Sequence, residues 1–265
     1  MLRRTILAAA ALAAAAAINP AAQAQDRVLK FGAAAEPYPP FTTQDASGKW
    51  VGFEVDLMNA VCAAESLKCE MVGTAWDGII PALNSNKIDV IWSSMAITAE
   101  RKKAIDFTEH YYNTPAEVVA LKSTPLKLTL ADDSALKGKI IGVQTSTTHA
   151  NFVTKHFGNL VTIKTYDTQD NANADLVAGR VDAIMADSVT LDDFLKTDQG
   201  RECEVKLLIP ADYDRATMGD GVGGGVRKSD TALRDKLSHG IKKIRADGTY
   251  AGIEKKYFKV DVFGS

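Results

Sequence analysis

Short apolar segments of strand length alternate along this chain with segments whose apolar residues recur at helical spacing. The segments typical of strands cover residues 28–34, 69–72, 88–92, 139–143, 161–165 and 181–186. The segments typical of helices cover residues 54–67, 99–105, 148–156, 170–178 and 188–196, and a short helix carries Trp76, Ile79, Ile80 and Leu83 on one face. Strands that alternate with helices indicate mainly parallel sheets flanked by helices. The pattern therefore predicts an α/β protein.

The alternating elements fall into two series, which indicates two lobes. Extended segments at residues 117–121 and 221–227 stand between the two series and after the second one. Two further helical segments, residues 230–246 and 250–257, follow the second extended segment. If the chain crosses between the lobes twice, these last helices have to pack back on the first lobe.

Residues 1–24 have the order of a secretory signal peptide. The basic pair Arg3-Arg4 precedes thirteen uncharged residues, 6–18, and Ala22-Gln23-Ala24 offers small residues for cleavage. This apolar run is shorter than the roughly 20 residues that span a bilayer. We therefore expect cleavage after Ala24 and export to the periplasm, with an uncleaved anchor as the alternative.

The charge balance argues against nucleic acid as a partner. The chain has 31 Lys and Arg against 33 Asp and Glu, and loss of Arg3 and Arg4 leaves 29 against 33, a net charge of −4. Domains that bind nucleic acid normally carry a basic excess. A mean hydropathy of −0.08 also argues against a polytopic membrane protein.

The three cysteines are Cys62, Cys69 and Cys203. Cys62 lies near the end of a predicted helix, and Cys69 opens the next predicted strand. In an oxidising compartment the two can form a disulfide, and two free buried thiols are the alternative. Cys203 is left as a free thiol. A metal site at the cysteines is not expected, because no histidine lies near any of them.

Motifs typical of enzymes are weak. Residues 219–224 fit Gly-x-Gly-x-x-Gly by letter, but no apolar strand precedes them and no helix opens within them. A glycine-rich crossing strand that lets the lobes move is the better interpretation. The four histidines, His110, His149, His156 and His239, show no metal-ligand spacing, so we expect no cofactor and no metal.

The remaining polar constellation favours binding of a zwitterion. Arg101 follows the strand 88–92 and the run 93–100, where a guanidinium can pair with a carboxylate. Residues 142–148 form a hydroxyl-rich turn that opens a helix and can hold an anion, and Asp187 ends a strand where it can meet an ammonium group. The alternatives are a surface ion pair for Arg101 and ordinary helix capping for the turn and for Asp187.

Several linked motifs occur in a specific order. They are Tyr38-Pro39-Pro40-Phe41, Val51-Gly52-Phe53-Glu54-Val55-Asp56-Leu57, Trp76-Asp77-Gly78-Ile79-Ile80-Pro81-Ala82-Leu83, Ile97-Thr98 with Glu100-Arg101, Ile105-Asp106-Phe107-Thr108, Leu136-Lys137-Gly138-Lys139, Gly179-Arg180-Val181-Asp182-Ala183 and Arg245-Ala246-Asp247-Gly248-Thr249-Tyr250. From about Val28 to its end, the chain resembles the periplasmic amino-acid-binding proteins of ABC importers, solute-binding protein family 3. It is most similar to the branch for lysine, arginine, ornithine, histidine, glutamine and opines.

This resemblance implies a two-lobed clamshell hinged by two crossing strands. Lobe one would comprise residues 26–115 and 222–265, and lobe two residues 116–221. The protein would be a monomer that closes on an amino acid and docks on an inner-membrane ABC permease. The Cys62/Cys69 pair is placed like the disulfide of the histidine-binding branch, which favours that pairing.

The resemblance also assigns the ligand contacts. Arg101 would hold the α-carboxylate with help from the main chain around Ser94 and Thr148. Asp187 would hold the α-ammonium, and Ser93 or Ser94 would accept a further hydrogen bond.

The resemblance also places three residues near the side chain of the ligand. Tyr38 and Trp76 would cover that side chain, and Glu36 lies near the position of an acidic residue that faces a cation. Glu36 stands two residues before Tyr38, whereas many relatives have the acidic residue three positions before the tyrosine. Two other departures are Ala96, where serine is common, and His149, where glutamine or a similar residue is frequent. We therefore expect a polar or cationic amino acid, or an opine derived from one.

An enzyme on the same fold is the alternative function, since similar proteins include a few cyclohexadienyl dehydratases. Such an enzyme needs a general acid and base, for which Glu36 and His149 are the only candidates. A sensory domain lacks support, because no membrane-spanning or kinase segment follows in the sequence.

Overall fold

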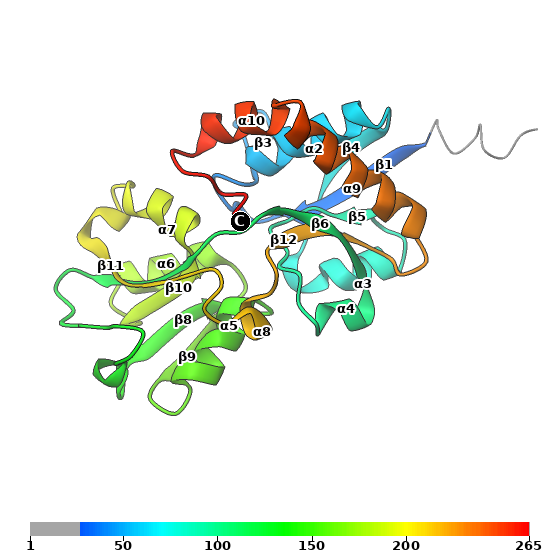
Figure 1. The fold of residues 1–265 in the computed structure, drawn as a ribbon. Helices are drawn as coiled ribbons and strands as arrows, with labels where there is room; N and C mark the ends of the chain where they lie inside the picture. The colour runs from blue at the N-terminus through cyan, green and yellow to red at the C-terminus, as the bar shows by residue number, and fades with distance from the viewer. Residues whose placement is uncertain (1–26, 265) are drawn as a thin grey trace, which may run out of the picture.

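The structure, a computed structural model, describes residues 27–264, so the expected signal peptide lies outside the described residues. Within this range the chain forms two lobes, each built on a five-stranded sheet with helices against its faces (Figure 1). No helix in residues 27–264 combines the length and apolar character needed to cross a bilayer. The predicted two-lobed α/β fold is confirmed.

The sheet of lobe one contains the N-terminal strand and the second crossing strand. Its order is β4 (Lys68–Thr74), β1 (Val28–Ala34), β5 (Val90–Ile91), β12 (Val222–Val226) and β6 (Asp106–Tyr112). β1 pairs in parallel with β4 and β5, whereas β12 pairs antiparallel with β5 and β6. A small ribbon, β2 (Thr43–Gln44) with β3 (Trp50–Val51), completes the strands here.

The sheet of lobe two has a similar mixture of directions. Its order is β11 (Cys203–Ile209), β7 (Ala116–Leu121), β10 (Ala183–Asp187), β8 (Ile140–Gln144) and β9 (Thr162–Tyr166). β8 pairs in parallel with β9 and β10, whereas β7 pairs antiparallel with β10 and β11. Both sheets are mixed rather than mainly parallel, because each lobe contains a crossing strand, β7 or β12, that runs against its neighbours.

Helices cover the faces of both sheets. Those built from the first and last parts of the chain are α2 (Phe53–Ala64), α3 (Ile79–Asn84), α4 (Arg101–Ala104), α9 (Thr231–Ala246) and α10 (Thr249–Tyr257). Those of lobe two are α5 (Thr148–Phe152), α6 (Gln169–Val177), α7 (Ser188–Leu195) and α8 (Arg215–Met218). Shorter helical turns are η1 (Trp76–Gly78), η2 (Ser134–Leu136), η3 (Val153–Phe157) and η4 (Gly200–Glu202).

The C-terminal helices return to lobe one, as the sequence predicts. α9 packs against α2 and β6, and α10 packs against α2 and α9 (Figure 1). The chain then ends beside the first crossing segment, where the Asn113 N–H donates to the carbonyl of Val262 at 2.7 Å. The C-terminal segment therefore contacts the hinge region directly.

Two strands of the five-stranded sheets, the two strands of the ribbon β2–β3 and the extent of two further elements differ from the sequence predictions. β6 and β11 are absent from those predictions, because charged residues interrupt their apolar pattern. Only residues 90 and 91 of the predicted strand 88–92 form a regular strand, β5. The predicted helix 99–105 is shorter in the structure and comprises only α4. The Thr98 hydroxyl accepts the Arg101 N–H at 3.2 Å, so a side chain caps the start of this single helical turn.

The glycines of β12 are explained by close packing. A β-carbon on Gly224 would stand 2.9 Å from the ring of Trp92, and one on Gly223 would stand 2.8 Å from the side chain of Ile97. Any larger residue would displace these buried side chains. Tight packing against Trp92 and Ile97 thus accounts for these two glycines, and their part in lobe movement stays a prediction.

A disulfide joins Cys62 and Cys69, which connects the last turn of α2 to β4. The predicted pairing is confirmed, and the two Cα atoms are 6.4 Å apart. Cys203 is a free thiol buried at the start of β11. Burial raises the pKa of the Cys203 thiol.

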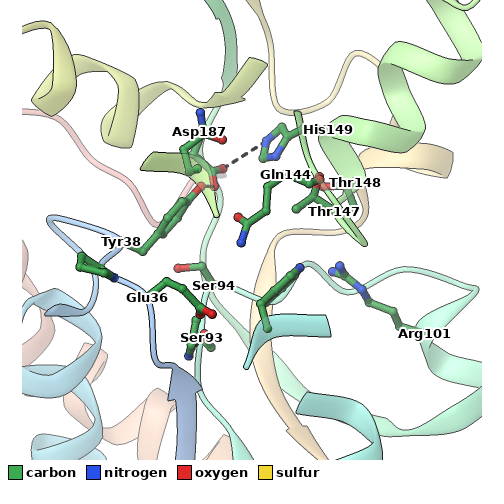
Figure 2. A pocket seen from close by; sticks show the side chains of 14 residues that line it. Glu36, Tyr38, Ser93, Ser94, Arg101, Gln144, Thr147, Thr148, His149 and Asp187 are labelled. Carbon is green, nitrogen blue, oxygen red and sulfur yellow. Dashed lines mark hydrogen bonds and ion pairs between the residues drawn. The ribbon is translucent and has the colours of Figure 1, made fainter. Parts of the chain in front are cut away.

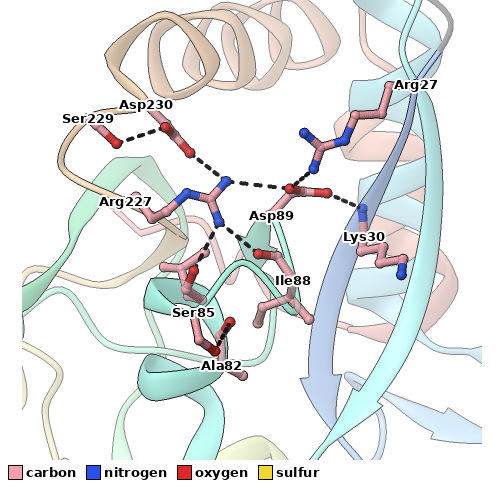
Figure 3. A network of polar contacts seen from close by, with 10 residues as sticks. Arg27, Lys30, Ala82, Ser85, Ile88, Asp89, Arg227, Ser229 and Asp230 are labelled. Atoms are coloured by element: carbon pink, nitrogen blue, oxygen red, sulfur yellow. Dashed lines mark hydrogen bonds and ion pairs between the residues drawn. The ribbon is translucent and has the colours of Figure 1, made fainter.

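A buried carboxylate, Asp89, connects three segments of lobe one (Figure 3). It accepts hydrogen bonds from the Arg27 guanidinium, from the Lys30 N–H at 3.0 Å and from the Arg227 guanidinium at 3.4 Å. Arg227 also donates to the Ile88 carbonyl at 2.9 Å and pairs with Asp230 at 2.6 Å. The network ties the start of β1 to the approach of β5 and to the turn after β12.

Candidate ligand-binding site

One pocket lies between the two lobes, where the carboxyl ends of strands from both sheets face each other (Figure 2). All of the predicted site residues line it: Glu36, Tyr38, Trp76, Ser93, Ser94, Arg101, Thr148, His149 and Asp187. The pocket has about 510 Å³ of empty space, part of it open to solvent. The structure therefore brings together residues that are far apart in the sequence.

Arg101 projects from the first turn of α4 and is the cation of the pocket. Its guanidinium donates to the carbonyls of Ala96 and Ser146, each at 3.0 Å, and lies 5.5 Å from the centre of the Trp76 ring. Both of these acceptors are carbonyl groups, and no carboxylate within residues 27–264 forms an ion pair with Arg101. Burial lowers the pKa of Arg101 to about 10, so the group stays charged at neutral pH. A partly buried guanidinium without a carboxylate partner is suited to an anionic ligand group.

The turn before α5 faces Arg101 from lobe two. The Thr147 hydroxyl accepts the Ala150 N–H at 3.1 Å and caps the helix. The first N–H groups of a helix, here those of Thr148 and His149, have no acceptor within the helix. They can donate to the same anion as Arg101 does.

Trp76 contacts both lobes. It packs at the edge of the apolar cluster around Ile79, but it lies in the turn η1, and not on the helical face that the spacing predicted. Its indole N–H donates to the Thr145 carbonyl at 3.0 Å across the cleft. Trp76 therefore closes one side of the pocket as a wall.

Asp187 is the carboxylate at the end of β10. It accepts the Tyr38 hydroxyl at 2.6 Å and the Thr114 hydroxyl at 3.1 Å. Burial, together with the charge of Asp187, raises the pKa of Tyr38 well above its ordinary value, so Tyr38 remains a donor. No Lys or Arg of residues 27–264 pairs with Asp187, which leaves its negative charge for a ligand cation.

His149 stands beside Asp187, with Nε2 at 3.8 Å from Oδ1 (Figure 2). Nε2 is buried and has no hydrogen-bond partner. Burial lowers the pKa of His149, an effect that the Arg101 charge increases and the Asp187 charge opposes. The ring is therefore neutral at pH 7, and its unbonded Nε2 points toward Asp187.

Glu36 lies on the lobe-one side of the pocket, before Tyr38. Its Oε2 is buried and has no hydrogen-bond partner in the described part of the chain. A buried carboxylate oxygen without a donor is costly unless a ligand supplies one. Glu36 is therefore the second carboxylate of the pocket that lacks a cation.

The two serines after β5 are already engaged within lobe one. The Ser93 hydroxyl accepts the Ala34 N–H at 2.8 Å. The Ser94 N–H donates to Glu54 at 2.7 Å, and its hydroxyl donates to the same carboxylate at 3.2 Å. The Ser94 N–H is thus directed away from the pocket, whereas the Ser94 hydroxyl retains its lone pairs.

Sequence reasoning missed four residues of this region. Gln144, Thr147 and Gln169 line the pocket, and Glu54 lies directly behind Ser94. Gln144 and Thr147 belong to the turn that was singled out, but Gln169 begins α6 and carries no distinguishing pattern. For Glu54 a signal exists, because an acid flanked by Phe53 and Val55 on a predicted buried helix needs a polar partner.

The arrangement suits the binding of a zwitterion. Among residues 27–264 no group of three His, Cys, Asp or Glu side chains is placed to hold a metal ion. Separated positive and negative side chains, a free helix N-terminus and two aromatic walls match a zwitterion with a polar side chain.

A family model describes this kind of protein. The model for bacterial extracellular solute-binding proteins, family 3, matches residues 29–260. The chain belongs to this family.

Relatives and solved structures agree with that assignment. The chain is 43% identical over 244 residues to an L-arginine-binding protein of Pseudomonas aeruginosa, covering 91% of this chain and 92% of the relative. It is 39% identical over 229 residues to a histidine-binding periplasmic protein of Salmonella typhimurium, covering 86% of each chain. An ancestral arginine-binding protein bound to arginine superposes with a TM-score of 0.79 at 34% identity, covering 87% of this chain and 98% of that one.

Proposed function

We propose that this chain is a periplasmic receptor that binds a cationic amino acid, such as arginine, between its lobes and delivers it to an ABC permease. Lobe one comprises residues 26–115 with 222–265, and lobe two residues 116–221. The receptor acts as a monomer in the periplasm after cleavage of residues 1–24. The names of its relatives, which describe binding of amino acids, support this function over an enzyme.

The charge pattern of the pocket carries the proposal. Arg101 supplies one positive charge, and Asp187 and Glu36 supply two negative charges, none of which has an oppositely charged Lys, Arg, Asp or Glu partner within residues 27–264. An amino acid with a cationic side chain has the complementary set of one negative and two positive groups. With such a ligand each of the three charges gains a partner. An aliphatic amino acid has no side-chain cation and would leave Glu36 unpaired.

The roles follow from position. Arg101 and the N-terminus of α5 hold the α-carboxylate, and Asp187 holds the α-ammonium. Glu36 accepts hydrogen bonds from the side-chain cation. Tyr38 and Trp76 add aromatic surfaces, which favour a guanidinium or ammonium group by about 0.5–2 kcal/mol. A glutamine amide can contact the same surfaces but leaves Glu36 without a cation, whereas an opine derived from a cationic amino acid keeps the side-chain cation.

A thermal-shift panel tests the proposal. The mature protein is heated with each of the twenty amino acids, with ornithine and citrulline, and with opines. We expect arginine, lysine or ornithine to give the largest rise in Tm. Glu36→Gln should reduce that rise for cationic ligands more than for glutamine, whereas Glu70→Gln, at an exposed position of β4, should change neither. The largest rise with leucine or isoleucine, together with a neutral Glu36→Gln, contradicts the proposal.

A further inference from the structure

Glu54 is a carboxylate buried directly behind the pocket wall. It lies in the first turn of α2, and none of its surface is exposed. One oxygen accepts the Ser94 N–H at 2.7 Å and the Tyr111 hydroxyl at 2.6 Å, and the other accepts the Ser94 hydroxyl at 3.2 Å. Two of its three donors thus come from one pocket residue, Ser94.

No cation neutralises this carboxylate. Its hydrogen-bond donors within residues 27–264 are one backbone N–H and two hydroxyl groups. Burial raises the pKa of Glu54 to about 7, and the negative charge of Asp187 contributes to the rise. A cation that enters the pocket near Asp187 therefore favours ionisation of Glu54.

Ser94 is held in one conformation by Glu54. Its backbone has φ of +51°, a left-handed conformation that is uncommon for a residue with a side chain. The bonds from its N–H and its hydroxyl to one carboxylate stabilise that conformation. When the hydroxyl donates to Glu54, both of its lone pairs remain available to accept from a ligand.

We propose that Glu54 is a positioning residue for the α-ammonium of the ligand, acting through the Ser94 hydroxyl, and that binding releases a proton from Glu54 to the solvent. The inference rests on the proposed function, because the ammonium group is the ligand's. An ionised Glu54 can only accept from Ser94, which fixes the hydroxyl as an acceptor toward the ammonium. A protonated Glu54 can instead donate to Ser94, and the hydroxyl then loses this orientation.

The ionisable groups near Glu54 do not titrate between pH 7 and 8, so they cannot account for a proton released in that range. From β6 it faces Tyr111 and Tyr112, whose pKa values burial raises well above the ordinary value. The negative charge of Asp187 in β10 acts on Glu54, and the charges of Asp187 and Arg101 in turn act on His149. Burial lowers the pKa of His149 below its ordinary value, and Arg101 remains charged, so neither exchanges protons between pH 7 and 8.

Calorimetric titration with L-arginine tests the inference. The titration is carried out from pH 6 to pH 8, and at pH 7 in phosphate and in Tris, whose ionisation enthalpies differ. For the wild-type protein we expect affinity to rise by up to about tenfold from pH 6 to pH 8, and the measured heat to differ between the buffers because a proton is released. Glu54→Gln should bind at least tenfold more weakly at pH 8 and show neither dependence.

Glu117→Gln is the matched control. Glu117 is also buried with a pKa raised to about 7, but it lies in β7 and does not line the pocket. Its variant should retain the pH dependence and buffer dependence of the wild-type protein. Tyr111→Phe keeps the charge of Glu54 but removes one donor, so it should shift the rise in affinity to higher pH. If Glu54→Gln fails to fold, the pH profile of Tyr111→Phe tests the role of Glu54 instead.

The outcomes separate the two proposals. If the wild-type protein binds no amino acid, the proposed function fails. If it binds arginine but Glu54→Gln binds within threefold of wild type at pH 8 with the same buffer dependence, only the role of Glu54 is overturned. An affinity that is flat from pH 6 to 8 in the wild-type protein, or a Tyr111→Phe profile that does not move, also overturns that role.

Discussion

Tyr38 and Asp187, 149 positions apart in the sequence, form a 2.6 Å hydrogen bond across the cleft. Tyr38 follows β1 of lobe one, and Asp187 ends β10 of lobe two, so the bond exists only when the lobes are closed. The Trp76 bond to Thr145 and the Arg101 bond to Ser146 join the lobes in the same way. Pocket residues therefore stabilise the closed arrangement themselves, in addition to any ligand they hold.

Tyr38→Phe should weaken binding of every amino acid ligand by about tenfold or more. A hydrogen bond to a charged group contributes roughly 1.5–3 kcal/mol, and this one is lost from the closed state alone. Titration calorimetry measures the change in Kd. Tyr213→Phe, an exposed tyrosine on lobe two, serves as the control and should bind as wild type. Equal affinities for Tyr38→Phe and wild type would show that the bond does not contribute to closure.

Replacement of Cys62 and Cys69 by alanine should lower the free energy of unfolding by roughly 2–3 kcal/mol. The disulfide closes a loop with a sequence separation of 7, and a short loop restricts the unfolded chain modestly. Denaturant unfolding with and without reductant measures the loss. Peptide mapping without reduction should find these two cysteines linked and Cys203 free. Three alkylatable thiols in the exported protein would contradict the assignment.

Asp89→Ala should destabilise lobe one by about 3–5 kcal/mol. Asp89 is 2% exposed, and its removal leaves Arg227, itself mostly buried, without one of its carboxylate partners. Arg27→Ala is the control: the Arg27 side chain is 62% exposed, and exposed pairs contribute at most about 1 kcal/mol. Thermal unfolding followed by circular dichroism compares the two variants. A loss for Asp89→Ala no larger than that for Arg27→Ala would refute a structural role for the network.

Glu117 should make the protein less stable as pH rises from about 5 to 7. Burial raises the pKa of Glu117 to about 7 from an ordinary 4.5, and Asp192 adds repulsion. The native state then holds a proton that the unfolded chain has released, so unfolding becomes more favourable with pH across this window. Glu117→Gln should therefore gain about 1–2 kcal/mol over wild type at pH 8 and almost nothing at pH 5. The same gain at both pH values would show that ionisation of Glu117 is not the cause.

The sequence predicts the lobes and their connection because these depend on periodicity. The strand β1 and the C-terminal helices α9 and α10 appear close to their predicted bounds. β6 was missed because its sequence, Asp-Phe-Thr-Glu-His-Tyr-Tyr, mixes charged and aromatic residues, and its pairing depends on β12, more than 100 residues away in the chain. Local pattern carries no information about such distant pairing.

The site was predicted as a set of residues more completely than as a geometry. Their positions at or after strand ends made Arg101 and Asp187 candidates, and the resemblance to the family assigned their roles. The orientation of Ser94 was not predictable, because it depends on the buried contact with Glu54. The bond between Tyr38 and Asp187 likewise depends on how two lobes meet, which no local sequence pattern specifies.

Titration of L-arginine into the wild-type protein and into Arg101→Ala tests the central claim most directly. The closed cleft desolvates the α-carboxylate, and loss of one partner from such a pair costs about 3–5 kcal/mol. The account predicts tight 1:1 binding by the wild-type protein and a Kd weaker by roughly two to four decades for a folded Arg101→Ala. An Arg101→Ala variant that binds arginine within threefold of the wild-type protein would contradict it.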